Sequence, residues 1–474
     1  MDRHLLILTF VLLIGVATPQ VNAADGQIIY VKADAQGANN GSSWSNAYTS
    51  LQTALAAATS GTEIWAAAGV YVPTTGASRR ATFQLKNGVA LYGGFRGQET
   101  FRDQRNWATN LTILSGDINQ RGVRDDNVYH VVTGSNTDAT AVLDGFTIRD
   151  GNANGTDAYS TGGGMLNSHG SPTVRHCIFS DNWATDGGGM YNLTGSPLLD
   201  KIIFSGNLAS GGAGGLYNST ASNPMILDTV FRGNQAALSG GGMVNTFKSS
   251  PTVFNTIFSG NVAGTWGGGL HNYTECDPIL VNALFTGNRA QLGGAFSCYG
   301  LCSPWIVNAT FGWNRASSQG GALYNVYAAT PTVRNSILWG NYAPDGDAIY
   351  LDGSSFISVA YSLVDGGWPG AGNLDADPLF MDADGADNLY GTADDDLRLR
   401  RDSPALDIGD NAEVPADTAD LDRDGDTAES VPRDLDGLPR FASPAPGSLP
   451  PVDLGAYETQ PFRAWRFFPL ALAR

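Results

Sequence analysis

Apolar and asparagine positions recur along the centre of the chain at a regular spacing. The clearest signature is a phenylalanine or leucine followed three positions later by asparagine, as in FSDN, FSGN and LWGN. A repeat of this kind predicts a solenoid, in which each copy forms one coil and contacts only its neighbours. Successive copies are 25 to 27 residues apart, with asparagines at Asn182, Asn207, Asn234, Asn261, Asn288, Asn314 and Asn341.

Two further signatures keep the same phase. One is a glycine cluster followed by an apolar residue, any residue and asparagine, and the other is a proline that opens a short apolar run. Each repeat therefore holds three short extended segments and no stretch long enough for an α-helix. This arithmetic predicts an all-β right-handed parallel β-helix with three strands per coil, because propeller blades and helical repeats are longer.

Apolar residues at equivalent positions are expected to stack as inward-facing columns, each about 4.8 Å above its counterpart. Asparagines at the turns are expected to hydrogen-bond to one another from coil to coil. A solenoid exposes an edge at each end, and residues 51–58 are the one clear helical stretch, so we expect this helix to cover the first coil. Two of the columns are Met165, Met190, Leu216, Met243, Leu270, Phe296 and Leu323, and Val174, Leu199, Ile226, Val253, Leu280, Ile306 and Val333.

The chain divides into five segments. Residues 1–23 read as a signal peptide, because a basic start precedes a short apolar run and a small-residue cleavage site. Residues 24–135 are expected to form an N-terminal cap and the first coils, and residues 136–365 the repeats. Residues 366–458 form an acidic C-terminal module, and residues 459–474 a tail. We expect no transmembrane span in the mature chain.

The glycine-cluster and FxxN signatures resemble the repeats of the chlamydial polymorphic outer-membrane protein family and, more widely, β-helix proteins of the pectate-lyase-like fold. The stretches DPLF, DLDGLPR and VDLGAYE resemble the choice-of-anchor Q module of bacterial surface proteins. These resemblances imply an exported protein, secreted or attached to the bacterial cell surface. They imply no particular reaction.

Acidic residues outnumber basic ones by 45 to 27, which gives a formal net charge of -18. A nucleic-acid partner is excluded by this balance, because phosphate binding needs a basic surface. The four cysteines of an exported chain meet an oxidising compartment. Cys276 and Cys302 occupy the same place on consecutive coils, so we predict a Cys276–Cys302 disulfide, with Cys298–Cys302 as the rival and Cys177 as a buried thiol.

Residues that support catalysis are sparse. Asn136-Thr137-Asp138 matches one motif of polygalacturonase-like hydrolases, but the GHG and RxK motifs that accompany it there are absent from the repeats. Arg175 and Arg334 lie at equivalent positions, and we expect no acidic column beside either. We therefore predict no catalytic residues. The favoured interpretation is a non-enzymatic adhesin, glycan-binding or envelope-structural protein, and the alternative is a polysaccharide lyase or glycoside hydrolase.

Carboxylates alternate with other residues in two stretches of the acidic module. Asp420, Asp422, Asp424 and Asp426 precede or flank a glycine turn, as in the first half of an EF-hand loop, although Glu429 stands in the tenth place rather than the twelfth. Asp382 and Asp384 begin a similar stretch. A solvated acidic loop is the other interpretation. We predict a structural Ca²⁺ that stabilises the module, since so many carboxylates repel one another without a cation.

One column on the glycine-cluster strands is expected to face solvent, because it lies between two inward-facing positions. Aromatic rings on such a face suit stacking on sugar rings, whereas the plain alternative is that tyrosine favours strands. The column therefore predicts a polysaccharide or cell-envelope component as partner. Its candidate ligand-binding residues are Tyr191, Tyr217, His271, Tyr324 and Tyr350.

Overall fold

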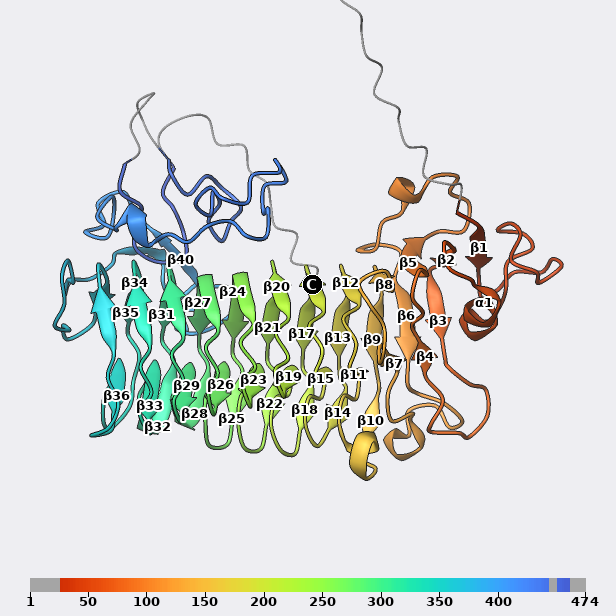
Figure 1. Ribbon diagram of the computed structural model, residues 1–474, viewed down its shortest axis with the longest axis horizontal. Coiled ribbons are helices and arrows are strands. Elements are labelled where there is room, and N and C mark those ends of the chain that lie inside the picture. The colour runs from red at the N-terminus through yellow and green to blue at the C-terminus, as the bar shows by residue number, and fades with distance from the viewer. Residues whose placement is uncertain (1–25, 443–449, 461–474) are drawn as a thin grey trace, which may run out of the picture.

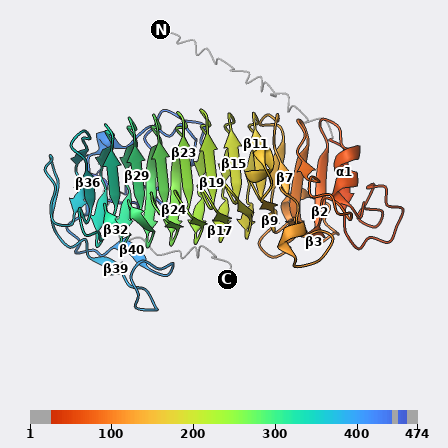
Figure 2. The same cartoon turned by 90° about the horizontal axis from the view of Figure 1, so that it is seen from below.

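The computed structural model describes residues 26–442 and 450–460, and it shows coils stacked along one long axis (Figures 1 and 2). The predicted signal peptide, residues 1–23, and most of the predicted tail, residues 461–474, lie outside the described residues. Within the described ranges, no helix is both long enough and apolar enough to cross a membrane.

Three parallel sheets run along the axis, so the predicted all-β parallel solenoid is confirmed. One sheet has ten strands: β4 Phe83–Gln84, β7 Val132–Thr133, β11 Met165–Ser168, β15 Met190–Leu193, β19 Leu216–Ser219, β23 Met243–Thr246, β26 Leu270–Tyr273, β29 Phe296–Tyr299, β33 Leu323–Val326 and β36 Ile349–Leu351. A second has seven: β10 Asn152–Ala153, β14 Trp183–Ala184, β18 Leu208–Ala209, β22 Gln235–Ala236, β25 Val262–Ala263, β28 Arg289–Leu292 and β32 Arg315–Gln319.

The third sheet, which we call the wide sheet, has 21 strands because most coils contribute two strands to it. Its members are β1 Ile28–Val31, β2 Glu63–Ala67, β3 Gly69–Tyr71, β5 Ala90–Phe95, β6 Thr112–Ser115, β8 Val142–Asp144, β9 Thr147–Arg149, β12 Thr173–Arg175, β13 Ile178–Ser180, β16 Leu198–Asp200, β17 Ile203–Ser205, β20 Met225–Leu227, β21 Val230–Arg232, β24 Thr252–Ser259, β27 Ile279–Thr286, β30 Trp305–Val307, β31 Thr310–Gly312, β34 Thr332–Arg334, β35 Ile337–Trp339, β37 Ser358–Ala360 and β38 Leu363–Val364.

A bend lies within the wide-sheet segment of each repeat coil, although β24 and β27 continue through it, and the residue at the bend has a positive φ. Asparagine tolerates this left-handed conformation better than most residues, which explains its frequency in the later coils. The coils thus form the three sheets expected of three extended segments per coil, and in most coils the bend splits the wide-sheet segment into two short strands. The bend column consists of His176, Lys201, Asp228, Asn255, Asn282, Asn308 and Asn335.

The predicted columns of side chains are present. Met165 pairs with Met190, and the register continues through Leu216 and Met243 along the ten-stranded sheet. The rings of Phe231 and Phe258 stack with their centroids 4.8 Å apart. All of these side chains are fully buried, so one apolar core follows the axis from coil to coil.

The predicted helix is α1, Leu51–Ala57, and it covers the first coil. Ser50 caps its N-terminus by accepting a hydrogen bond from the Thr53 amide at 3.4 Å. Leu51, Ala54 and Leu55 are buried against the core. Four short 3₁₀ helices lie in connections: η1 Arg102–Gln104, η2 Arg124–Asp126, η3 Asp157–Ser160 and η4 Asn411–Glu413.

The C-terminal segment folds back over the wide sheet and contains one antiparallel pair, β39 Phe380–Asp382 and β40 Asp396–Leu399 (Figure 1). Two apolar clusters join it to the coils. One brings Leu397 and Leu454 against Leu284, and the other brings Val431 against Phe254. The acidic module therefore packs on the flank of the β-helix and does not extend it.

Arg440, from the DLDGLPR stretch, lies at the centre of this contact and is fully buried. Its guanidinium donates to the Asn282 side chain at 2.7 Å and to the carbonyl of Ala456 at 2.7 Å. It also forms an ion pair with Glu458 at 3.5 Å. One side chain thus ties the closing VDLGAYE stretch to the bend column of the coils.

Candidate functional site

The outward column predicted on the ten-stranded sheet has the expected register. Tyr191 pairs with Tyr217, and Tyr324 pairs with Tyr350. The rings of each pair are stacked, with centroids 5.1 Å apart in the first pair and 5.3 Å apart in the second. All four tyrosines are half-buried.

The middle of this column differs from the prediction, because it is not exposed. Val244, His271 and Ser297 separate the two tyrosine pairs, and all three are buried. The His271 ring stacks against Trp266 at 5.9 Å, and its Nδ1 atom lies 2.7 Å from the Ser297 hydroxyl. Burial lowers the pKa of His271 to about 4, so it is neutral at physiological pH. The predicted flat strip is therefore broken at its centre, and His271 is not part of an exposed surface.

A second run of aromatic rings lies where these strands end, and it is continuous. Phe247, Tyr273, Tyr299 and Tyr327 come from four consecutive coils and form what we name the aromatic ridge. Neighbouring ring centroids are 5.9, 5.4 and 4.4 Å apart along the ridge. Phe247 is 52% exposed, Tyr273 37% and Tyr327 57%. Three strand spacings of about 4.8 Å give the ridge a length of roughly 14 Å.

Polar groups border the ridge. Lys248 and Glu275 form an exposed ion pair at 3.2 Å beside Phe247 and Tyr273. At the other end, the Tyr327 amide donates to the Asp352 carboxylate at 2.8 Å. Hydrogen bonds from Tyr327, Ser355 and Ser354 outweigh partial burial and lower the pKa of Asp352 to about 2. The ridge thus combines largely exposed aromatic side chains with charged groups at its sides.

The sequence signal for the ridge is weak, because its members do not share one offset from the repeat motif. Tyr273 directly follows the ladder residue Asn272, whereas Phe247 and Tyr327 stand two positions after Asn245 and Asn325. Phe247 and Tyr327 have positive φ values, 52° and 59°, at the turn. This backbone conformation turns the chain so that the shifted residues join the same column in space.

The wide sheet carries a column of charged side chains that we did not predict from the sequence. Arg175 pairs in register with Asp144 on one side and Asp200 on the other. The expectation that no acidic column accompanies Arg175 was therefore wrong for this residue. Asp144 lies before the strict repeats begin, whereas Asp200 follows Arg175 by 25 residues, the ordinary repeat spacing, so this half of the column could have been predicted from the sequence. Arg334 bonds instead to Glu413 of the C-terminal segment at 3.1 Å.

The charges of this column largely pair with one another. Asp144 contacts Arg105 at 2.8 Å and His176 Nδ1 at 2.9 Å, and Arg175 lies 3.6 Å from Asp200. Although burial raises the pKa of Asp144, the His176 hydrogen bond and Arg105 lower it by more, so the net shift is downward. Asp144 is therefore held ionised by its partners.

All four cysteines are buried and are free thiols in the structure. The Cys276 amide lies 3.5 Å from the Cys302 sulfur, which places these residues on consecutive coils as predicted. Hydrogen bonds from the Cys276 and Cys298 thiols lower the pKa of Cys302. The structure does not show the Cys276–Cys302 disulfide, which stays a prediction.

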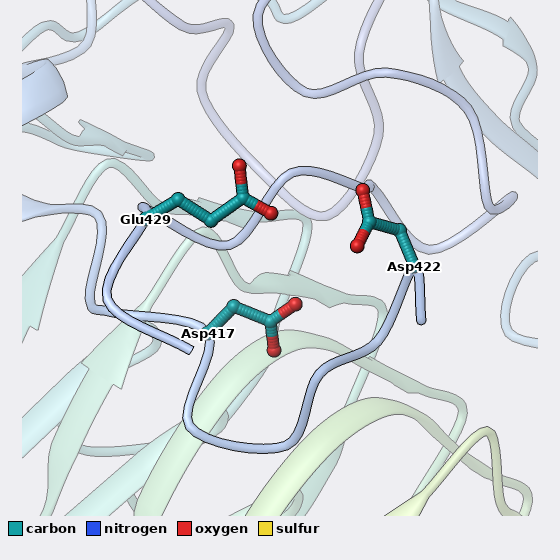
Figure 3. A group of neighbouring side chains, drawn as sticks. All are labelled: Asp417, Asp422 and Glu429. Atoms are coloured by element: carbon teal, nitrogen blue, oxygen red, sulfur yellow. The ribbon is translucent and has the colours of Figure 1, made fainter. Parts of the chain in front are cut away.

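The two acidic stretches differ in whether their carboxylates lie close enough together to hold a metal ion. Asp382 and Asp384 belong to no cluster of three donor residues within the described ranges. Asp422 is shared by two such clusters, one with Asp420 and Asp424 and the other with Asp417 and Glu429 (Figure 3). Asp426 is exposed and belongs to neither.

Comparisons with known proteins agree with the fold. Residues 109–290 match the family model described as "Right handed beta helix region". The crystal structure of pectate lyase Pel9A is similar with a TM-score of 0.51 and 12% sequence identity, over 92% of this chain and 97% of that chain. No curated protein matches the sequence. At this level of identity the similarity shows the architecture alone, and with the observed coils it establishes that the chain is a right-handed parallel β-helix.

Proposed function

We propose that this chain is an exported, surface-associated protein that binds polysaccharide through the aromatic ridge and does not cleave it. The observation that carries the proposal is the continuous contact of Phe247, Tyr273, Tyr299 and Tyr327, of which all but the half-buried Tyr299 are exposed. A run of exposed rings costs solvation free energy unless a ligand covers it. The resemblance to bacterial surface repeats and to the choice-of-anchor Q module supports an extracellular or outer-envelope location.

The chemistry of the ridge suits a glycan. An aromatic ring offers an apolar face to the C–H groups of a sugar, and the tyrosine hydroxyl offers a hydrogen-bond donor and acceptor to its hydroxyls. Rings repeated from coil to coil match a ligand that is itself a linear repeat. The described part of the C-terminal segment packs on the wide sheet, so it leaves the ridge on the ten-stranded sheet open.

A polysaccharide lyase or glycoside hydrolase is the second candidate, and one observation favours it. Asp144, Arg175 and Asp200 form a charged column on the wide sheet, and the pectate lyase shares the fold. We place this candidate second because the column is paired internally. Arg105 and His176 are committed to Asp144, so neither is a free base or a free acid.

Paired variants test the proposal. The double variant Tyr273→Ala/Tyr327→Ala should weaken polysaccharide binding by at least about tenfold, which corresponds to roughly 1.4 kcal/mol. Both side chains are exposed, so thermal stability should stay nearly unchanged. The matched control is Tyr191→Ala/Tyr217→Ala, which removes a half-buried pair outside the ridge and should keep binding. Binding is measured on a polysaccharide array with the purified mature protein.

The same array decides between the two candidates. Release of unsaturated or reducing sugar ends by the parent, lost in Asp144→Asn, would establish cleavage and contradict a purely binding role. Equal binding by the ridge variant and the parent would exclude the ridge as the binding surface. If only the Tyr191→Ala/Tyr217→Ala control loses binding, the binding surface is the tyrosine column predicted from the sequence.

A further inference from the structure

The loop between residues 417 and 429 is closed at its base by the main chain. Ala416 forms an antiparallel bridge with Ser430, and the Asp417 amide donates to the Glu429 carbonyl at 2.7 Å. Asp417 and Glu429 therefore face each other across the neck of the loop. The chain then folds back, and the Leu421 amide donates to Asp417 Oδ2 at 2.7 Å, which brings Asp422 to the same place.

Three carboxylates meet at this neck (Figure 3). One oxygen from each of Asp417, Asp422 and Glu429 lies within 4.8 Å of the other two. Asp417 is fully buried, and the other two are half-buried. In each residue one carboxylate oxygen is buried and has no hydrogen-bond partner: Asp417 Oδ1, Asp422 Oδ1 and Glu429 Oε1.

Unpartnered buried oxygens of this kind are costly, because a carboxylate removed from water must be neutralised or hydrogen-bonded. Burial raises the pKa of Asp417, with a further contribution from the charges of Asp422 and Asp420. Burial and the neighbouring aspartates raise the pKa of Glu429 in the same way. The arrangement is thus unfavourable without a positive charge among the three groups.

We propose that Asp417, Asp422 and Glu429 bind one Ca²⁺ ion at the neck of this loop. Oxygens bound to a common Ca²⁺ at about 2.4 Å lie no more than about 4.8 Å apart, and these three donors meet that limit. An all-oxygen donor set selects Ca²⁺ over the transition metals, which favour histidine or cysteine. The flexible loop geometry favours Ca²⁺ over Mg²⁺, which demands a strict octahedron.

This site differs from the one expected from the alternating aspartates. Asp420 Oδ1 already accepts the Gly425 amide at 3.1 Å, and Asp424 Oδ1 accepts the Asp426 amide at 2.7 Å. These bonds shape the turn, and neither Asp420 nor Asp424 has a buried oxygen without a partner, whereas Asp417, Asp422 and Glu429 each have one. The unpartnered oxygens therefore favour the neck over the alternating aspartates as the site of the ion. Asp417 lies outside the alternating pattern, and only the closed neck brings it to Asp422.

Binding of the ion would hold the loop of residues 417–429 against the coils. Leu421, next to Asp422, packs on a cluster that contains Phe254 of the wide sheet and Val431 of the C-terminal segment. Holding Asp422 at the neck keeps Leu421 in this cluster. Loss of Ca²⁺ should therefore loosen residues 416–431 first and leave the coils intact.

The test compares the full mature chain with Ca²⁺ and with a chelator. Calorimetric titration with Ca²⁺ should show one site, and saturating Ca²⁺ should raise the melting midpoint of the C-terminal segment by roughly 2 °C or more. Asp417→Asn should abolish both responses. Because it also relieves repulsion, this variant should be as stable as the parent, or more stable, in chelator. An aspartate with a purely structural role would lose stability under both conditions.

Asp426→Asn is the matched control, because it removes a carboxylate from the same loop outside the cluster and should keep the response. Asp422→Asn is a second test at a half-buried position, in case Asp417→Asn folds poorly. The proposal is overturned if the parent binds no Ca²⁺ by calorimetry and melts identically with Ca²⁺ and chelator. It is also overturned if Asp426→Asn abolishes binding while Asp417→Asn and Asp422→Asn retain it.

Discussion

Single asparagine side chains connect the coils of this protein by hydrogen bonds inside its core. Asn234 is fully buried, and its Oδ1 atom accepts bonds from the main-chain amide and the side chain of Asn207 at 3.1 and 3.0 Å. Its Nδ2 atom donates to the Phe204 carbonyl at 2.9 Å and to Asn261 at 3.0 Å. Every polar atom of the side chain is thus satisfied within the repeat, which explains why one residue type recurs at this turn.

The variant Asn234→Leu should destabilise the coils by at least about 3 kcal/mol. It removes four hydrogen bonds and leaves Asn207 and Phe204 with buried, unpaired groups, each of which costs about 1–3 kcal/mol. Chemical denaturation followed by circular dichroism measures the change. Asn223→Ala, at an exposed position, should cost less than about 1 kcal/mol. Equal stability of Asn234→Leu and the parent would show that the ladder satisfies polar groups without stabilising the stack.

At the scale of strands, consecutive coils are held by main-chain hydrogen bonds and by side-chain columns in register. The column Asn167, Asn192, Asn218, Asn245 and Asn272 is interrupted where Cys298 replaces asparagine and resumes at Asn325, and the Asn272 side chain lies 3.9 Å from the Cys298 sulfur. Three of the four cysteines thus lie near the position where cysteine replaces asparagine in this column. This local change brings three thiols to one place.

In protein purified under oxidising conditions, we predict a disulfide between Cys276 and Cys302. Cys276 and Cys302 are neighbours on consecutive coils, and a disulfide-exchange reagent would supply the oxidant. The bond would link two consecutive coils and stabilise the fold by about 3 kcal/mol. Peptide mapping without reduction identifies the pair. A Cys298–Cys302 peptide would contradict the prediction, and the Cys276→Ser variant provides the control.

The repetitive elements could be predicted from the sequence, whereas features that depend on contacts between distant segments could not. The columns led by Met165 and Val174 follow from spacing alone, because each residue meets its counterpart one coil away. The contact of Arg440 with Asn282 spans 158 residues and has no counterpart in any periodicity. The aromatic ridge and Asp417 were missed for a different reason, because local turns rather than the repeat spacing bring their side chains together.

At the scale of the whole molecule, negative charge is concentrated where the C-terminal segment meets the coils. Several of its carboxyl groups are buried there. Burial raises the pKa of Asp434 to about 6 against the opposing effect of Arg440, and burial also raises the pKa of Asp453. These groups hold protons more tightly in the folded protein than in the unfolded chain.

We therefore predict that, in chelator, the C-terminal segment becomes less stable as the pH rises from about 4 to about 7. A carboxyl with a raised folded pKa stabilises the protonated folded state, and this contribution is lost between its unfolded and folded pKa values. For Asp434 the loss amounts to roughly 2–3 kcal/mol, at about 1.4 kcal/mol per pKa unit. Thermal melting combined with limited proteolysis of the segment measures it. Stability that rises over this pH range would contradict the prediction.

The long-range attachment of the C-terminal segment also sets an order of events during folding. Neighbouring coils join residues only 25 to 27 positions apart, so each coil can add to the one before it as the chain emerges. Arg440 and the stretch at Gly455 bind Asn282 and Asn335, so their binding surface exists only after those coils have formed. The C-terminal segment is therefore placed after the coils to which it binds. Until it arrives, apolar residues of the wide sheet such as Phe254 stay uncovered, which is the interval in which a newly made chain is most exposed to aggregation.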